Sequence, residues 1–239
     1  MSEPLVEHQD IPNPGQRAPL KGNWIACLLI CGLGVVALWF DRMFADPNNL
    51  ETLPGDLKRI VTLSEVFGHG YGIAIVGIGV WLLAKSHRRL IPRIVFCAIW
   101  PSLGVHLVKL FFARLRPVNF FDEKSNTSFP ENISETFLGW LPRQELNTIY
   151  HFQSFPSAHA ATAWGLAIGM AWAFPRGRWL FFTLAFLASA QRVSSFAHWT
   201  SDVLFGIAIA FLMAGAITQN WGLGYYFGKF ENRSASSAN

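Results

Sequence analysis

The sequence predicts an all-α integral membrane protein, a helical bundle with six transmembrane helices and an outward-facing active site. Hydrophobic residues make up 51% of the 239 positions, charged residues 14% and aromatic residues 15%. A soluble domain carries about 25% charged residues. Apolar runs that approach the length of a membrane-spanning helix also recur along the chain. These observations exclude the soluble globular, disordered, collagen-like and coiled-coil classes.

Six apolar segments account for the expected spans. A helix needs about 20 apolar residues to cross the hydrocarbon core, within a range of about 17–25. A cleaved signal peptide is a less favoured interpretation of the first segment, because no small-residue cleavage site follows it. The expected spans are Trp24–Phe40, about Tyr71–Ala84, Ile94–Phe112, Ala160–Phe174, Trp179–Ala197 and Ser201–Thr218.

Basic residues predict the orientation of these spans, because Lys and Arg accumulate in cytoplasmic loops. They gather in residues 85–93, at Arg176 and Arg178, and beside both ends of the apolar region. With six spans, all of these positions fall on one side of the membrane. We therefore expect both termini in the cytoplasm. The short chain and simple layout favour a bacterial inner membrane protein, and the face opposite the termini is then periplasmic.

The expected organisation is one membrane domain between two tails. Residues 1–23 form a cytoplasmic tail, residues 24–227 the six-span domain, and residues 228–239 a C-terminal tail that is expected to be disordered. Residues 113–158 form a long outer loop whose aromatic residues suit either the headgroup level of the bilayer or a small core within the loop. Apolar residues at helical spacing within residues 41–67 indicate an interfacial helix.

The net charge of +4 does not indicate a nucleic-acid partner, because the basic residues lie beside apolar spans and are explained by membrane orientation. Cys27, Cys31 and Cys97 lie in apolar stretches and match neither a disulfide framework nor a zinc pattern. The sequence shows no close set of carboxylate or histidine ligands, so no metal or other cofactor is expected. Three further titratable residues are interpreted as packing or interface residues: Glu65, His69 and His106.

The first cluster of chemically informative residues runs from Lys109 to Pro117 and reads KLFFARLRP. If the preceding helix continues, Lys109 and Arg116 lie two turns apart and point the same way, and Pro117 ends the helix. An Arg fork and a Lys charge at one helix end suit an anion with several oxygens. The alternative is a pair of anchors at the membrane boundary. Arg114 faces elsewhere on such a helix and is a weaker candidate.

The second cluster, Phe155–His159, reads FPSAH and lies where the fourth span begins. Pro and Ser are favoured at helix starts. The free N–H groups and the positive end of a helix form an anion site there. His159 is then within reach of a bound anion. The alternative is a histidine that is satisfied at the membrane interface.

The third cluster, Gln191–Asp202, reads QRVSSFAHWTSD. Arg192 lies near the end of an apolar span and therefore needs a counter-charge. His198 and Asp202 are four residues apart, so the carboxylate can hold one imidazole nitrogen. The other nitrogen is then available as a nucleophile or a base. The alternative is a structural His–Asp pair that caps the sixth span.

Together the three clusters resemble the type 2 phosphatidic acid phosphatases, membrane lipid phosphatases of the acid phosphatase and vanadium haloperoxidase superfamily. That family shows K-x6-R-P, P-S-G-H and S-R-x5-H-x3-D in this order, and the resemblance covers about residues 60–218. The first pattern is complete, whereas Ala158 replaces the glycine of the second and Gln191 the serine of the third. The Ala158 N–H stays available, and Gln191 can donate from its amide with a different reach.

The resemblance implies phosphoryl transfer through a phosphohistidine, without a metal. In that scheme His198 is the nucleophile, Asp202 orients it, and His159 is the general acid and base. The implied phosphate-binding residues are Lys109, Arg116, Arg192, Ser157 and Ala158, with Gln191 as a further candidate.

The implied substrate is a lipid whose phosphate or diphosphate headgroup is presented by the bilayer. Candidates are undecaprenyl diphosphate, phosphatidylglycerol phosphate, phosphatidic acid and lipid A. Two alternatives stay open: a lipid-to-lipid phosphotransferase of the same family with a lipid A-type acceptor, and a non-catalytic phospholipid-binding or carrier protein. A soluble vanadium haloperoxidase fits poorly because of the six apolar segments.

Overall fold

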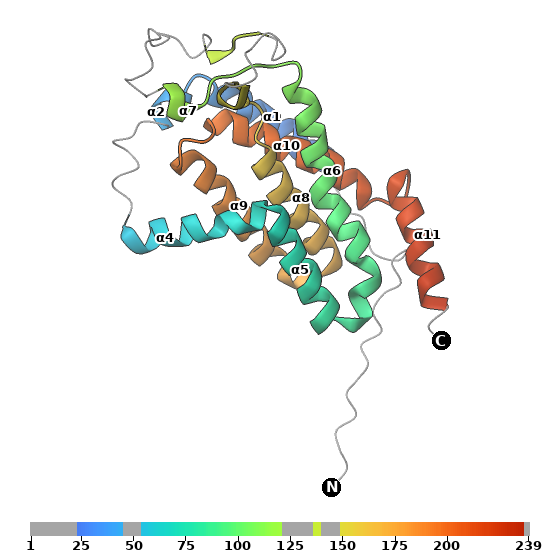
Figure 1. Cartoon of the computed structure of the whole chain (residues 1–239). Coiled ribbons are helices and arrows are strands. Elements are labelled where there is room, and N and C mark those ends of the chain that lie inside the picture. The colour runs from blue at the N-terminus through green and yellow to red at the C-terminus, as the bar shows by residue number, and fades with distance from the viewer. Residues whose placement is uncertain (1–22, 45–53, 121–135, 140–148, 237–239) are drawn as a thin grey trace.

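The structure, a computed structural model, describes residues 23–44, 54–120, 136–139 and 149–236 (Figure 1). Within these ranges all regular elements are helical, and the only strand-like pairs are isolated bridges from Arg114 to Phe137 and to Gln153. The elements are α1 (Asn23–Ala37), α2 (Asp41–Phe44), α4 (Gly55–Ser64), η2 (Glu65–Gly68), α5 (Gly70–Leu83), η3 (Lys85–Leu90), α6 (Ile91–Lys109), α7 (Pro117–Phe120), η6 (Ile149–Phe152), α8 (Ala158–Ala173), η7 (Pro175–Gly177), α9 (Arg178–Ser194), α10 (Thr200–Ile217) and α11 (Leu223–Ser236).

Helix α8 forms the centre of the bundle and packs against α6, α9 and α10, while α1 lies against α10 (Figure 1). Nearly every residue of α8 is buried. Small residues permit this close packing. A Cβ at Gly165 would clash with the carbonyl oxygen of Cys97 on α6, and one at Gly206 would clash with the carbonyl oxygen of Ser157. Close approach of backbones at small residues is typical of membrane helix bundles.

Apolar helices occur at all six positions where spans were expected, namely α1, α5, α6, α8, α9 and α10. Among the described residues, Lys85–Lys109 and Thr200–Ile217 are each long and apolar enough to cross a membrane. Gly55–Gly68 and Gly70–Leu83 qualify only as a pair, which is bent by 78°. The all-helical, apolar architecture is thus confirmed, and the count of six spans stays a prediction.

The chain after Lys109 differs from the sequence-based expectation. Helix α6 ends at Lys109, so Lys109 and Arg116 do not share a helix face, and Pro117 begins α7 instead of ending a helix. The reason is that backbone N–H groups in this segment find partners in neighbouring loops. The N–H of Arg114 donates to the carbonyl of Phe152 at 2.7 Å, and that of Arg116 donates to His151 at 3.0 Å.

The C-terminal region also differs from the expected disordered tail, because α11 continues to Ser236. Glu231 of this helix reaches Arg93 on α6, with 2.8 Å between Oε1 and Nε, and both side chains are buried. The Arg93 guanidinium also lies 4.4 Å from the ring centre of Trp172 on α8. A partner far away in the sequence therefore orders a segment whose local composition predicts disorder.

The helix expected within residues 41–67 is α4, which packs against α9. Its interfacial position stays a prediction. Residues 1–22, which make up most of the expected N-terminal tail, lie outside the described residues. So do residues 121–135 and 140–148 of the expected outer loop, and the expectations for these segments stay untested.

Candidate active site

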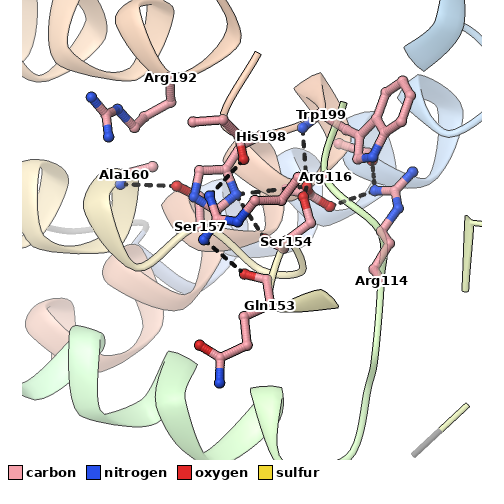
Figure 2. Close-up of polar contacts among 12 residues, drawn as sticks. Arg114, Arg116, Gln153, Ser154, Ser157, Ala160, Arg192, His198 and Trp199 are labelled. Carbon is pink, nitrogen blue, oxygen red and sulfur yellow. Dashed lines mark hydrogen bonds and ion pairs between the residues drawn. The ribbon is translucent and has the colours of Figure 1, made fainter. Parts of the chain in front are cut away.

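The three sequence clusters meet at one end of the bundle (Figures 1 and 2). The end of α6, the start of α8 and the α9–α10 turn supply them. Contacts join the clusters directly. Arg116 Nη1 donates to the carbonyl of Ala197 at 2.8 Å, and the Ser157 N–H donates to the carbonyl of Asp202 at 2.9 Å. The fold therefore brings together residues that the sequence separates by about 90 positions.

His198 is buried in the α9–α10 turn, and its Nδ1 lies 2.7 Å from the carbonyl oxygen of Ser154. A carbonyl only accepts hydrogen bonds, so we assign the proton of the neutral ring to Nδ1. Nε2 then carries the free lone pair, and among the described residues it has no hydrogen-bond partner. This tautomer suits a nucleophilic imidazole.

Asp202 acts on His198 mainly through Ser154. Its Oδ2 lies 3.7 Å from His198 Nδ1, beyond hydrogen-bond distance. The same oxygen accepts from Ser154 Oγ at 2.5 Å and from the Trp199 N–H at 3.0 Å. The hydroxyl of Ser154 thus contacts Asp202. The carbonyl of the same residue contacts His198 (Figure 2). Sequence reasoning missed Ser154, because nothing in its spacing to either residue marks it.

The surroundings of His198 favour its neutral form. Burial lowers the pKa of His198 from its ordinary value of 6.5 to about 4. Asp202 opposes this shift, and the positive charges of Lys109 and Arg116 add to it. His198 is therefore unprotonated at neutral pH.

Lys109 and Arg116 converge on one backbone oxygen although they do not share a helix. Lys109 Nζ donates to the carbonyl of Gln153 at 2.5 Å. Arg116 Nη2 donates to the same oxygen at 3.3 Å, and both Arg116 and Gln153 are labelled in Figure 2. Arg116 Nε also donates to the carbonyl of Tyr150 at 3.0 Å. The extended segment after α6 thus brings Arg116 back to Lys109, beside His198. Both cations have neutral backbone carbonyls as their partners.

Arg114 was the weaker candidate in the sequence, and it proves to be a central support. Its side chain is fully buried and lies on the opposite side of the group from Arg192 (Figure 2). The guanidinium donates to Asp202 Oδ1, to Asp41 Oδ2 at 2.9 Å and to Ser201 Oγ at 2.8 Å. Arg114 therefore neutralises Asp202. The expectation that Arg114 faces away from the site was wrong, because it assumed a continuing helix and α6 ends at Lys109.

The start of α8 offers an anion site of the expected kind. Ser157 is the N-cap residue, and its Oγ accepts from the Ala160 N–H at 3.4 Å. The N–H groups of Ala158 and His159 belong to the first turn, where no earlier helical carbonyl can pair with them. Ala158, the replacement for the family's glycine, keeps its N–H within this turn.

His159 is positioned by the η2 turn. Its Nε2 lies 3.4 Å from the carbonyl oxygen of Glu65, and its ring meets that of His69 edge-on with 4.1 Å between centroids. A Cβ at Gly68 would lie 2.5 Å from His159 Cδ2. A side chain at Gly68 would therefore occupy the space of the imidazole.

Glu65 was interpreted as a packing residue, but it is the counter-charge of Arg192. Glu65 Oε1 pairs with Arg192 Nη2 and lies 3.1 Å from His69 Nε2. Glu65 Oε2 accepts from Gln191 Nε2 at 3.2 Å, and Gln191 Oε1 accepts from Arg192 Nε at 2.6 Å. Gln191 thus belongs to a clamp around Arg192. The one sequence signal for Glu65 was a carboxylate beside an apolar span.

The structure also corrects the expectation that no close set of metal ligands exists. Glu65, His69 and His159 place three donor atoms within 4.8 Å of one another. Arg192 shares Oε1 of Glu65, so a cation bound there would have to displace a guanidinium.

Comparisons with known proteins show which proteins this chain resembles. The family model described as PAP2 superfamily matches residues 91–223, which include all three clusters. The chain is 26% identical over 206 residues to a lipid A 1-phosphatase of Rhizobium etli, covering 80% of this chain and 81% of the relative. It is 25% identical to a lipid A 1-phosphatase of Rhizobium johnstonii, covering 80% and 77%. The crystal structure of Aquifex aeolicus LpxE shares the fold, with a TM-score of 0.52 and 21% identity over 76% of this chain and 93% of that one.

Proposed function

The chain belongs to the PAP2 superfamily, and on this premise we propose that it is a membrane lipid phosphatase that removes a phosphate group from lipid A. The family resemblance of the three sequence clusters is thereby confirmed. The names of the two Rhizobium relatives favour lipid A over undecaprenyl diphosphate, phosphatidylglycerol phosphate and phosphatidic acid. The observation that carries the proposal is the neutral His198, whose Nδ1 is held by the Ser154 carbonyl and whose ring lies near the positive charges of Lys109 and Arg116.

In the first step of the proposed reaction, His198 takes the phosphoryl group. Nε2 attacks phosphorus in line with the lipid oxygen, the P–N bond forms, and the P–O bond to the lipid breaks. Burial, Arg192 and His69 lower the pKa of His159 to about 3 without a ligand, and the negative charge of the bound phosphate group opposes this shift, so the ring binds a proton in the complex. His159 then donates that proton to the departing oxygen. The His198 ring then carries a positive charge, which the Ser154 carbonyl and the Asp202 carboxylate stabilise from the Nδ1 side.

In the second step, water attacks the phosphohistidine. His159, now neutral, accepts a proton from the water, the P–N bond breaks, and inorganic phosphate leaves. His198 returns to its neutral form. Lys109, Arg116 and Arg192 neutralise the phosphate oxygens in both steps, together with the N–H groups at the start of α8.

The scheme uses protein groups alone, and we propose that it proceeds without a metal. Cationic side chains and a helix N-terminus supply the charge stabilisation that metal ions give in many phosphoryl transfers. Activity that persists in EDTA would agree with this proposal.

We further propose six spans, with both termini in the cytoplasm and the site on the periplasmic side of a bacterial membrane. The basic turn η3, which contains Arg88 and Arg89, lies at the opposite end of α6 from Lys109. Since basic residues mark the cytoplasmic side, the site at Lys109 falls on the outer side.

Phosphate release from a lipid panel tests the proposed function. The purified protein in detergent receives lipid A, undecaprenyl diphosphate, phosphatidylglycerol phosphate or phosphatidic acid, each with EDTA present. We expect the fastest release from lipid A and none from His198→Ala. The matched control is His87→Ala, because His87 lies in η3, at the opposite end of α6 from the site.

Two results would redirect the proposal. Faster release from another lipid would transfer the assignment to that substrate. No release from any lipid would contradict a hydrolase, and adding a second lipid as acceptor would then reveal a phosphotransferase.

A further inference from the structure

We propose that Glu65 is an internal occupant of the phosphate site, which holds Arg192 in the empty enzyme and is displaced when a phosphate group binds. The inference rests on the phosphatase function proposed above. It adds that the Glu65 carboxylate competes with the substrate phosphate for Arg192. Glu65 precedes residues 91–223, the segment that the family model matches, so the family pattern does not include it.

Arg192 differs from the other two cations in the partner that it binds. Lys109 and Arg116 donate to backbone carbonyls, which carry no net charge. Arg192 is paired with the Glu65 carboxylate through Nη2. A phosphate oxygen that approaches Arg192 therefore has to replace an anion, whereas at Lys109 or Arg116 it replaces only a neutral acceptor.

Gln191 completes the enclosure of Arg192. Its amide oxygen accepts from Arg192 Nε at 2.6 Å, and its amide nitrogen donates to Glu65 Oε2 at 3.2 Å. The guanidinium thus meets two oxygens of the protein, much as it would meet two oxygens of a phosphate. In Figure 2, Arg192 lies apart from the group formed by Arg116, Ser157 and His198. This position fits a cation that is engaged elsewhere until a ligand arrives.

The Glu65 side chain has room to leave this position. It is 30% exposed, and the Arg192 side chain is 13% exposed, so solvent reaches the ion pair. Glu65 also begins the short η2 turn, which forms the end of Gly55–Gly68 and leads into the bend of 78° before Gly70–Leu83. Outward rotation of this side chain would release Arg192 to a phosphate while His69 remained as a partner for the carboxylate.

Two roles are open to Glu65: it can compete with phosphate for Arg192, or it can position Arg192 for phosphate. The two roles predict opposite changes in phosphate affinity when the charge of Glu65 is removed. If Glu65 competes with phosphate, Glu65→Gln binds phosphate more tightly, because Arg192 becomes available and a negative charge next to the dianion disappears. If Glu65 merely positions Arg192, the same variant binds phosphate more weakly. His69, His159 and Arg192 are the titratable or charged groups that face Glu65 in both cases.

Isothermal titration calorimetry of the full-length protein with inorganic phosphate shows whether the affinity rises or falls, and so decides between the two roles. We expect Glu65→Gln to bind phosphate about fivefold more tightly than the wild type, a ratio that corresponds to about 1 kcal/mol. The matched control is Asp56→Asn, which removes one negative charge from an exposed position on α4. Asp56→Asn is expected to leave the affinity unchanged.

Further variants exclude trivial explanations. In an Arg192→Gln background, Glu65→Gln is expected to raise phosphate affinity by less than it does in the wild-type background, because only the loss of the nearby negative charge remains and no competition for Arg192 is relieved. Glu65→Ala repeats the test if the Gln variant is poorly folded. With the lipid substrate, KM is expected to be lower in Glu65→Gln than in the wild type.

Equal or weaker phosphate binding by both Glu65 variants would overturn the inference. Absence of phosphate binding in the wild type and in both variants would contradict the phosphatase function itself. Tighter binding by Asp56→Asn to the same degree would reduce the effect to general electrostatics and would also overturn the proposal.

Discussion

His198 illustrates how a catalytic side chain can be fixed by a backbone group. The spacing of His198 and Asp202 predicted a direct contact, but Nδ1 donates to the Ser154 carbonyl at 2.7 Å, and the carboxylate lies 3.7 Å away. Arg114 and the Ser154 hydroxyl occupy the carboxylate instead. Asp202 therefore acts by holding Ser154 and by placing a negative charge near the ring.

The low pKa of His198 gives a first prediction. Burial lowers this pKa to about 4, and Lys109 and Arg116 add to the effect. The nucleophile must be unprotonated, so kcat/KM is expected to stay high as the pH falls through 6.5 and to be lost only near pH 4. The measurement is the pH dependence of kcat/KM, corrected for the ionisation of the substrate phosphate.

Lys109→Gln provides the control for this profile. Removal of a positive charge near the ring raises the pKa of His198, so the acid limb is expected to move to higher pH in this variant. An acid limb that lies near pH 6.5 in both the wild type and Lys109→Gln would contradict the assignment of His198 as a nucleophile with a lowered pKa.

Individual site residues were predictable where a motif fixed their spacing. Lys109, His159, Arg192 and His198 were identified in this way, and the structure places them at one end of the bundle. Glu65, Arg114 and Ser154 could not be identified, because their roles depend on contacts between segments that lie far apart in sequence. No local pattern encodes a contact of that kind.

The η2 turn and the start of α8 act as a unit that positions His159. A second prediction follows from Gly68, where a Cβ would lie 2.5 Å from the imidazole. Gly68→Ala is expected to rotate His159 and to lower kcat by about 10- to 100-fold, since displacement of a catalytic group by about 1 Å has effects of this size. Steady-state kinetics with the lipid substrate measures the change.

Gly70→Ala is the matched control, because a Cβ at Gly70 meets no atom within 4 Å. It introduces the same methyl group two residues away and is expected to leave kcat near the wild-type value. Equal kcat values in the two variants would show that the turn does not position His159.

Helix ends were the elements that sequence reasoning placed least well. The apolar runs identified the helical cores, because hydrophobicity is read directly from composition. The end of α6 was misplaced, since the residues after Lys109 are compatible with a helix and lose it only by pairing with residues 136–139 and 151–154. That pairing depends on tertiary structure.

At the scale of the whole bundle, α11 packs against η3 and α10. Arg93 and Glu231 form a buried ion pair there, and Arg93 Nη2 also donates to the carbonyl of Gly224 at 2.9 Å. The sequence predicted the all-helical, apolar architecture correctly. It did not predict this contact, because composition indicates disorder after residue 228 unless a distant partner is known.

Loss of this ion pair gives a third prediction. Glu231→Gln leaves the Arg93 charge buried without its partner and is expected to lower the free energy of unfolding by about 3–5 kcal/mol. Thermal unfolding of the protein in detergent measures the effect. Lys229→Gln, at an exposed position on the same helix, is the control and is expected to change stability little. Similar melting temperatures for both variants would show that α11 does not stabilise the bundle.

The most direct test of the central claim is to trap the phosphorylated enzyme. Lipid A labelled with ³²P is mixed with purified protein, the reaction is stopped in alkali, which preserves phosphohistidine, and the labelled peptide is identified. We expect label on the peptide that contains His198 in the wild type, and neither label nor phosphate release in His198→Ala. Phosphate release from His198→Ala at the wild-type rate, or label on another residue, would contradict the mechanism.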